Sequence, residues 1–267
     1  MQYLTIKAGV MTPNYGDAQF YRSNNAAVLS NPVVGNWIMD AYTTNPGIEI
    51  MGRYKGIIGM FGTNNGRLNY GRGNNIGEDL VFNWKLGYDS ELTEGLRVRA
   101  TVSGYHVPDG HSGSYLWSGD RAGARYYSVM DTIDGDNFRS GRWDPGSGQS
   151  KMSAYQGALL AQFKGLELFG FYEMMSGVLR GSDQNFTQLG IQAKYTYRSL
   201  YAVVRYNKVD DKMNSSVNRI NLGLGWFLTD HVLMKLDYVI QNYIGPAHAY
   251  LDGGHFNGLV LEAGISF

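Results

Sequence analysis

The chain contains no cysteine, which excludes disulfide scaffolds, thiolate zinc sites, iron–sulfur clusters and cysteine nucleophiles. Only 17% of its residues are charged, well below the roughly 25% of an ordinary globular chain. The 23 basic and 23 acidic residues cancel, and a formal net charge of zero argues against a nucleic-acid-binding protein.

Long apolar runs are also missing. The longest uncharged stretch near the start, Ser23–Met39, holds four Asn, a Pro and a Gly, so it is too polar to cross a membrane as a helix. The first residues lack the pattern of a secretory signal, so either a signal has been removed or the chain starts inside a longer precursor. No nucleophile elbow, H-E-x-x-H, P-loop or dinucleotide motif is found either, and no catalytic residue is predicted.

Glycine and aromatic residues are abundant, with 36 Gly, 20 Tyr, 11 Phe and 5 Trp, yet the mean hydropathy is only −0.28. An alternation with a period of two explains this combination. In one run Phe82, Trp84 and Leu86 share a face, and Asn83 and Lys85 lie on the opposite face. Successive side chains of a strand point to opposite faces, so this pattern predicts β-strands.

Twelve such strands are predicted, an even number that puts both chain ends on the same side. The expected ranges are 3–11, 47–54, 55–62, 79–89, 95–106, 152–163, 166–177, 186–197, 199–208, 216–227, 231–242 and 257–267. Very short turns, such as Lys164-Gly165 and Arg198-Ser199, alternate with longer polar segments. The longer segments are expected at 12–46, 63–78, 107–151, 179–185, 209–215 and 243–255.

Two folds place one apolar and one polar face on each strand: a soluble antiparallel sandwich and a transmembrane barrel. The barrel is favoured because the predicted strands approach the 9–11 residues of a tilted membrane strand, and because many apolar faces end in aromatic residues. The prediction is therefore an all-β, antiparallel, up-and-down transmembrane barrel. It forms a single outer-membrane domain over residues 1–267, with long extracellular loops near 12–46 and 107–151.

Two stretches resemble known outer-membrane proteins. Leu259, Leu261, Ala263 and Ile265 alternate up to the terminal Phe267, which looks like the insertion signal of outer-membrane barrels. The opening stretch, with Lys7–Asp17, Arg22–Asn25, Asn31-Pro32 and Val34–Asp40, is similar to porin-like outer-membrane proteins of Bacteroidetes-type bacteria. More distantly it resembles phosphate-selective porins. The close resemblance covers about the first 60 residues.

The resemblance has consequences for strand number and for one loop. It implies about sixteen strands, of which this chain carries twelve; the alternative is a complete barrel of twelve. It also implies that the loop after the first strand folds toward the pore. The pore-loop candidates are Tyr15, Asp17, Arg22 and Trp37.

A lumen-facing set of charges follows from the alternation, because charged side chains are costly on the lipid face. The inward cations are Lys7, Arg53, Lys85, Arg97, Arg99, Lys194, Arg205, Arg219 and Lys235, and the inward acids are Glu49, Glu167, Glu173, Asp237 and Glu262. This basic excess indicates a mild anion preference. Arg97 and Arg99 either contact anions or brace the wall by pairing with Glu49, Glu167 or Glu173.

No cofactor is expected, although one loop could hold a cation. Asp131, Asp134 and Asp136 form an oxygen-rich patch of the type that Ca²⁺ favours, but their spacing is not that of an EF-hand, and a polar surface loop is the alternative. His106 and His111 flank Asp109, which allows a metal pair or a solvated loop.

The sequence thus predicts a porin-like channel of the bacterial outer membrane that passes small hydrophilic solutes by passive diffusion. The expected partners are outer-membrane lipid, small hydrophilic or anionic solutes, and either a second copy or another envelope protein, but no nucleic acid. Two alternatives are a plugged barrel that serves as a structural or partner-binding component of an envelope complex and, less favoured, an outer-membrane enzyme.

Overall fold

Twelve antiparallel strands form one sheet, and each pairs with the next strand of that sheet along the chain. The computed structural model describes residues 3–23, 28–41, 43–66, 80–109, 116–119, 149–179, 182–212, 214–246 and 252–266. The strands are β1 (Leu4–Met11), β3 (Asn45–Tyr54), β4 (Ile57–Asn64), β5 (Val81–Thr93), β6 (Leu96–Val107), β8 (Gln149–Phe163), β9 (Leu166–Leu179), β10 (Ser182–Tyr197), β11 (Leu200–Asp211), β12 (Ser216–Thr229), β13 (Val232–Ile244) and β14 (His255–Ile265). The predicted all-β, up-and-down fold and its strand number are confirmed.

Some strands are longer than predicted. β9 continues to Leu179, and β10 already begins at Ser182. Most of the polar segment expected at 179–185 is therefore strand. The stretch Ser182–Asn185 carries no apolar residue and therefore shows no alternation, but pairing with β9 holds it in the sheet. A prediction based on periodicity stops where one face loses its apolar residues.

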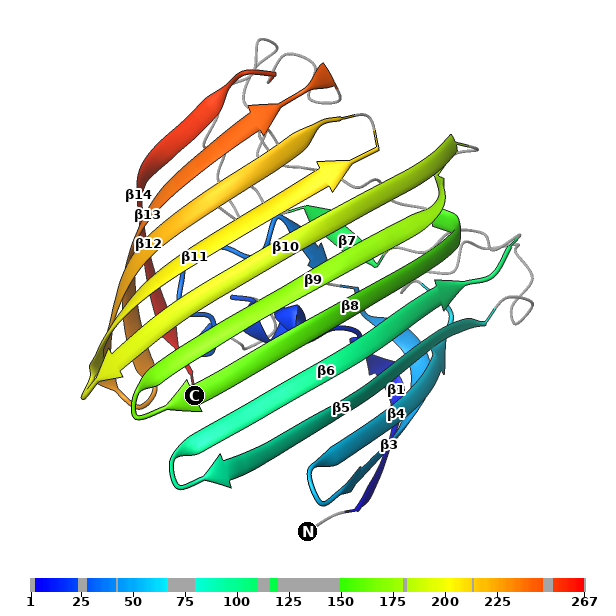
Figure 1. Cartoon of the computed structure of the whole chain (residues 1–267), viewed down its shortest axis with the longest axis horizontal. Helices are drawn as coiled ribbons and strands as arrows, with labels where there is room; N and C mark the ends of the chain where they lie inside the picture. The colour runs from blue at the N-terminus through cyan, green and yellow to red at the C-terminus, as the bar shows by residue number, and fades with distance from the viewer. Residues whose placement is uncertain are drawn as a thin grey trace.

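Two of the short turns, Lys55-Gly56 and Lys164-Gly165, are of the type that a twisted hairpin requires. At the β8–β9 turn, Lys164 and Gly165 have φ angles of 44° and 88°, and two positive values are the signature of a type I′ turn. These turns lie on one side of the sheet, where β1 also begins and β14 ends (Figure 1).

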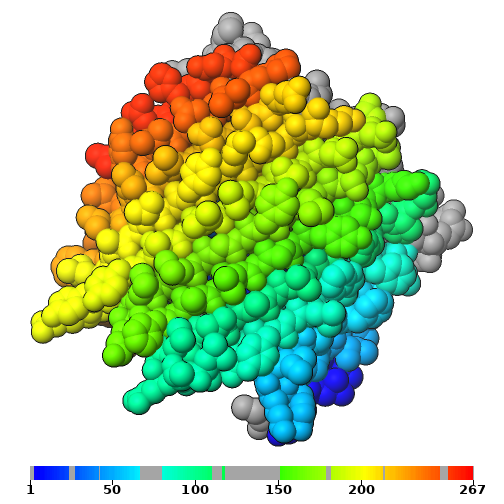
Figure 2. All heavy atoms as spheres, viewed as in Figure 1, coloured from blue at the N-terminus to red at the C-terminus, as the bar shows by residue number. Residues whose placement is uncertain are grey.

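The two faces of the sheet are inverted relative to those of a soluble protein. Large apolar side chains on the outer face are exposed, for example Leu86 at 56% and Leu224 at 59%. Polar side chains on the inner face, such as Gln192 and Asn221, are each only 1% exposed. A sandwich would bury the apolar face, whereas a barrel in lipid exposes it. Figure 2 shows the outer face as a continuous surface of adjoining strands.

The sheet ends at β1 and β14. No pairing between these two strands occurs among the described residues, and a closed barrel of twelve strands would require one. Across the described part of the chain, no helix is long and apolar enough to span a membrane.

The connection 12–44 is named here the inner segment, and its described residues, 12–23, 28–41 and 43–44, leave β1 and turn into the concave side of the sheet (Figure 1). The segment contains a short 3-10 helix, η1 (Ala18–Tyr21), and β2 (Met39–Ala41). β2 pairs with β7 (Trp117–Gly119) in a separate two-stranded sheet. The periodicity predicted neither element, because three residues are too few to show alternation.

Candidate functional site

The first half of the inner segment is held by a buried carboxylate. Asp17, 5% exposed, forms ion pairs with Lys85 Nζ at 2.9 Å and Arg99 Nε at 2.7 Å. Thr101 Oγ1 donates to the same carboxylate at 3.0 Å. These partners lie on β5 and β6, so Asp17 ties the segment to two adjacent strands.

Burial by itself raises the pKa of the Asp17 carboxyl, but hydrogen bonds and positive charge from Arg99 and Lys85 outweigh it. The result is a pKa lowered from 3.8 to about 2. Because the docked carboxyl has the lower pKa, its contribution to docking is complete above pH 3.8 and is lost as the pH falls through about 2.

We therefore expect the inner segment to stay docked from neutral pH down to pH 4, and its anchor at Asp17 to weaken between pH 3.8 and about 2. Fluorescence of Trp37, which is buried in the same segment, measures this loss as a function of pH. The Asp17→Asn variant should lack this acid transition. An identical transition in that variant would contradict the assignment.

The second half of the segment is held by hydrogen bonds from its backbone to side-chain amides and a carboxylate of the wall. Ile38 N donates to Asn207 Oδ1 at 2.6 Å, and Met39 N donates to Gln188 Oε1 at 2.8 Å. Val34 N donates to Asp237 Oδ2 at 3.2 Å. Buried backbone groups need such partners, so the polar inner face is what allows the segment to lie inside the sheet.

Trp37 is the largest apolar anchor of the segment. The Arg205 guanidinium carbon Cζ lies 3.9 Å from the centroid of the Trp37 ring. The same ring meets Phe171 edge-on, with ring centroids 4.8 Å apart. Phe171 in turn covers Gly190, where an added Cβ would lie only 2.1 Å from the ring. A glycine at this position therefore makes room for the aromatic contact.

An apolar cluster fills the concave side near the long connections. It joins the inner segment, β7 and the strand ends on that side, and includes Tyr15, Ile38, Met39, Tyr105, Trp117, Met152, Met175, Val209, Val217 and Tyr243. Glu173 lies beside it and accepts hydrogen bonds from Tyr15 Oη at 2.8 Å and Trp117 Nε1 at 3.1 Å. This end of the interior is packed with buried side chains.

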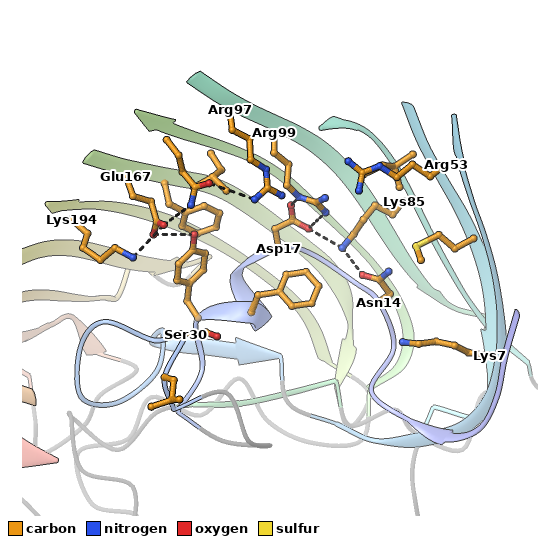
Figure 3. A pocket seen from close by; sticks show the side chains of 18 residues that line it. Lys7, Asn14, Asp17, Ser30, Arg53, Lys85, Arg97, Arg99, Glu167 and Lys194 are labelled. Carbon is orange, nitrogen blue, oxygen red and sulfur yellow. Dashed lines mark hydrogen bonds and ion pairs between the residues drawn. The ribbon is translucent and has the colours of Figure 1, made fainter. Parts of the chain in front are cut away.

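The end near the short turns is open instead. A cavity of about 660 Å³ lies there between the inner segment and the wall (Figure 3). Six predicted pore-lining cations border it: Lys7, Arg53, Lys85, Arg97, Arg99 and Lys194. Asp17 is the one pore-loop candidate that reaches the cavity.

Of the predicted inward acids, Glu167 also lines the cavity. The other predicted residues that the structure describes lie on the concave side but away from it. Arg205, Arg219 and Lys235 are each 1% exposed beneath the inner segment, and Lys235 forms an ion pair with Glu262. Glu49 accepts a hydrogen bond from Asn14 N at 2.6 Å. Arg22 pairs with Asp40 at 2.8 Å within the segment itself. These residues hold the segment in place rather than facing open space.

The bracing partners expected for Arg97 and Arg99 are wrong. Neither pairs with Glu49, Glu167 or Glu173; both pair with Asp89, with Arg97 Nε 2.8 Å and Arg99 Nη1 3.2 Å from its carboxylate. Asp89 lies directly opposite Arg99 in the β5–β6 register, which explains the choice. The alternation that assigns Lys85 to the inner face also assigns Asp89 to that face. The predicted lumen-facing acids omit Asp89, since it is the last residue of the predicted strand 79–89.

A histidine–serine pair on the outer face bears on the enzyme alternative. His106 Nδ1 lies 3.3 Å from Ser153 Oγ, and Trp84 Nε1 donates to His106 Nε2 at 3.1 Å. The indole donor requires an unprotonated Nε2, so a neutral ring carries its proton on Nδ1, facing the serine. A serine nucleophile needs the opposite tautomer, with a free nitrogen to accept its proton.

We expect no serine-dependent hydrolysis of phospholipid by this pair. Purified protein in phospholipid vesicles should release fatty acid at the same background rate before and after Ser153→Ala. A release rate that falls on this substitution would contradict the tautomer argument and restore the enzyme alternative.

Within the described part of the chain, no group of three His, Asp or Glu residues is placed to hold a metal ion. The cation candidates Asp131, Asp134 and Asp136 lie outside the described residues, as do His111 and Phe267.

Comparison with known proteins connects this architecture to outer-membrane β-barrels. No family model matches the chain, and no curated protein matches it in sequence. Among solved structures, outer-membrane expressed OmpT of Vibrio cholerae is similar over 100% of this chain and 78% of its own, at 7% identity and a TM-score of 0.58. OprB of Pseudomonas putida is similar over 99% and 70%, at 13% identity and a TM-score of 0.57. An anion-selective porin from Comamonas acidovorans is similar over 99% and 73%, at 12% identity and a TM-score of 0.53. The chain therefore has the fold of bacterial outer-membrane β-barrels, and its exposed apolar face fits that membrane.

Proposed function

We propose that this chain forms a porin-like channel of the bacterial outer membrane, passing small hydrophilic solutes with a mild preference for anions. The observation that carries the proposal is the basic cavity on the concave side of a sheet whose outer face is apolar. Arg53, Arg97 and Arg99 all contact the single carboxylate of Asp89, so positive charge exceeds negative charge along this wall. Rings of basic side chains favour anions in pores.

Porins and channels among the structural neighbours support the same reading at the level of fold. The anion preference agrees with the distant resemblance of the opening stretch to phosphate-selective porins. The resemblance of the same stretch to porin-like outer-membrane proteins suggests a Bacteroidetes-type origin. Lipid would contact the outer face, and the solute would contact the cavity.

Bilayer conductance tests the proposal. We expect the protein to conduct in planar bilayers, and the combined Arg97→Ala and Arg99→Ala substitutions to lower the ratio of anion to cation permeability. Lys164→Ala with Arg198→Ala is the matched control, because it removes two cations from turns outside the cavity. Absence of conductance, or a permeability ratio that the first pair leaves unchanged, would overturn the anion-channel proposal.

The packed apolar cluster favours one second candidate, a plugged barrel that binds a second copy or another envelope protein. A packed cluster of buried side chains leaves less room for water and ions along its part of the interior. Purified protein that inserts into bilayers without conducting would support this candidate over the channel.

A further inference from the structure

The cavity near the short turns has two chemically different walls (Figure 3). One wall, from β3, β5 and β6, carries Arg53, Lys85, Arg97 and Arg99. The adjoining wall, from β8, β9 and the inner segment, contributes apolar side chains: Leu160 and Phe169 from the sheet, with Phe20 and Tyr21 from the inner segment. A pore for small inorganic ions needs only the first wall.

The apolar wall is arranged as an aromatic surface. Tyr21 lies against Phe169, with ring centroids 4.4 Å apart and an interplanar angle of 34°. Tyr21 Oη donates to Glu167 Oε1 at 3.3 Å, and Lys194 lies 3.2 Å from the other oxygen of that carboxylate. The hydrogen bond to Glu167 thus helps to hold the Tyr21 ring against Phe169.

Phe20 is the unusual residue of this wall. Its side chain belongs to the inner segment and is 49% exposed, whereas Tyr15 and Trp37 of the same segment are each 1% exposed. The Lys85 ammonium lies 5.3 Å from the centre of the Phe20 ring. An aromatic ring left exposed inside a polar interior, beside cations, provides a contact surface for a bound molecule.

The basic wall has more cations than carboxylates to pair with them. Asp17 and Asp89 are the two carboxylates that pair with its four cations, which leaves an excess of two positive charges. Arg53 and Arg97 have side chains 49% and 48% exposed, so their guanidinium groups remain open to a further oxygen ligand. Arg99 is only 18% exposed and serves mainly to hold Asp17.

We propose that this cavity is a binding site for aromatic carboxylates. The carboxylate accepts hydrogen bonds from Arg53 and Arg97, and the ring packs against Phe20 and the Tyr21–Phe169 pair. A volume of about 660 Å³ accommodates such a molecule with water. The inference deepens the proposed channel function, on which it rests for the route of entry, by naming the solute class.

Equilibrium binding to the detergent-solubilised protein tests the site without requiring conduction. We expect benzoate to bind about tenfold more tightly than acetate, because the ring buries apolar surface that acetate lacks. Phe20→Ala should remove that difference, and Arg97→Gln should weaken the binding of both acids. Both side chains are about half exposed, so neither substitution removes a core contact.

Two matched controls are present in the chain. Phe61→Ala removes a phenyl ring of similar exposure, 55%, from the outer face. Arg198→Gln removes a guanidinium from a short turn outside the cavity. Both variants should bind benzoate as the unsubstituted protein does.

Each remaining outcome decides a different question. Equal binding of benzoate and acetate, or a benzoate preference that survives Phe20→Ala, overturns the site. Tighter binding of inorganic phosphate than of benzoate overturns the aromatic class. Conductance without benzoate binding rejects the site and leaves the channel standing, whereas benzoate binding without conductance supports the site and rejects the channel.

Discussion

Replacing the inner segment by an Asn-Gly turn is expected to raise the unit conductance several-fold. Met11 and Asn45, which flank the segment, are paired in the β1–β3 register, so a two-residue type I′ turn can join them without moving either strand. The replacement removes the residues that the segment contributes to the apolar cluster: Tyr15, Ile38 and Met39. Wall side chains that now bind the segment, such as Gln188 and Asn207, would bind water instead.

Single-channel recording in planar bilayers measures this effect. Lys55 and Gly56 form an equivalent two-residue turn on the opposite side of the sheet, and both have positive φ angles. Exchanging them for Asn-Gly is the matched control and should leave the conductance unchanged. A conductance that stays at the original value after removal of the segment would show that ions do not pass along the space it occupies.

Asp17→Ala is expected to destabilise docking of the inner segment by about 3–5 kcal/mol, the usual effect of breaking a buried ion pair from one side. Lys85, only 1% exposed, would lose its charged partner, and its ammonium would keep only Asn14 Oδ1 and Gly16 O as acceptors. Arg99 would lose both hydrogen bonds to the same carboxylate. The free energy is read from a denaturant titration of Trp37 fluorescence, with a Trp37→Phe variant identifying the contribution of that residue.

Two comparisons isolate the ion pair. Adding Lys85→Met to Asp17→Ala should recover a large part of the loss, because no unpaired ammonium then remains buried. The Lys208–Asp210 pair is similarly close, at 2.8 Å, but has side chains 39% and 43% exposed, so Asp210→Ala should cost at most about 1 kcal/mol. Equal losses for Asp17→Ala and Asp210→Ala would contradict the assignment of Asp17 as the anchor.

The fold was predictable because lipid and lumen impose opposite demands on alternate residues. Leu222 and Asn221 are neighbours in sequence, yet the first is 46% exposed on the outer face and the second 1% exposed on the inner face. An alternation of apolar and polar residues with a period of two therefore indicates a strand with one face toward lipid and the other toward the interior. It fails at Ser182–Asn185, where the strand is polar on both faces and only its neighbour keeps it extended.

The site was predictable only in part. Alternation placed Lys85, Arg97 and Arg99 on one face, but a one-strand pattern carries no information about their partners on other strands or in the inner segment. Asp89 and Asp17 became the partners because register and the course of the inner segment bring them within 3.2 Å of these cations.

By itself, the sequence determined where the twelve strands of the large sheet lie and which face their alternating side chains occupy, because both follow from local alternation and a preference for lipid or water. Tertiary structure alone decided that the inner segment fills the end of the interior near the long connections and leaves a basic, partly aromatic cavity near the short turns. That division depends on contacts such as Tyr15 with Glu173 and Trp37 with Arg205, which join residues more than 150 positions apart. No local pattern encodes pairs so distant, because their meeting depends on the curvature and register of the whole sheet.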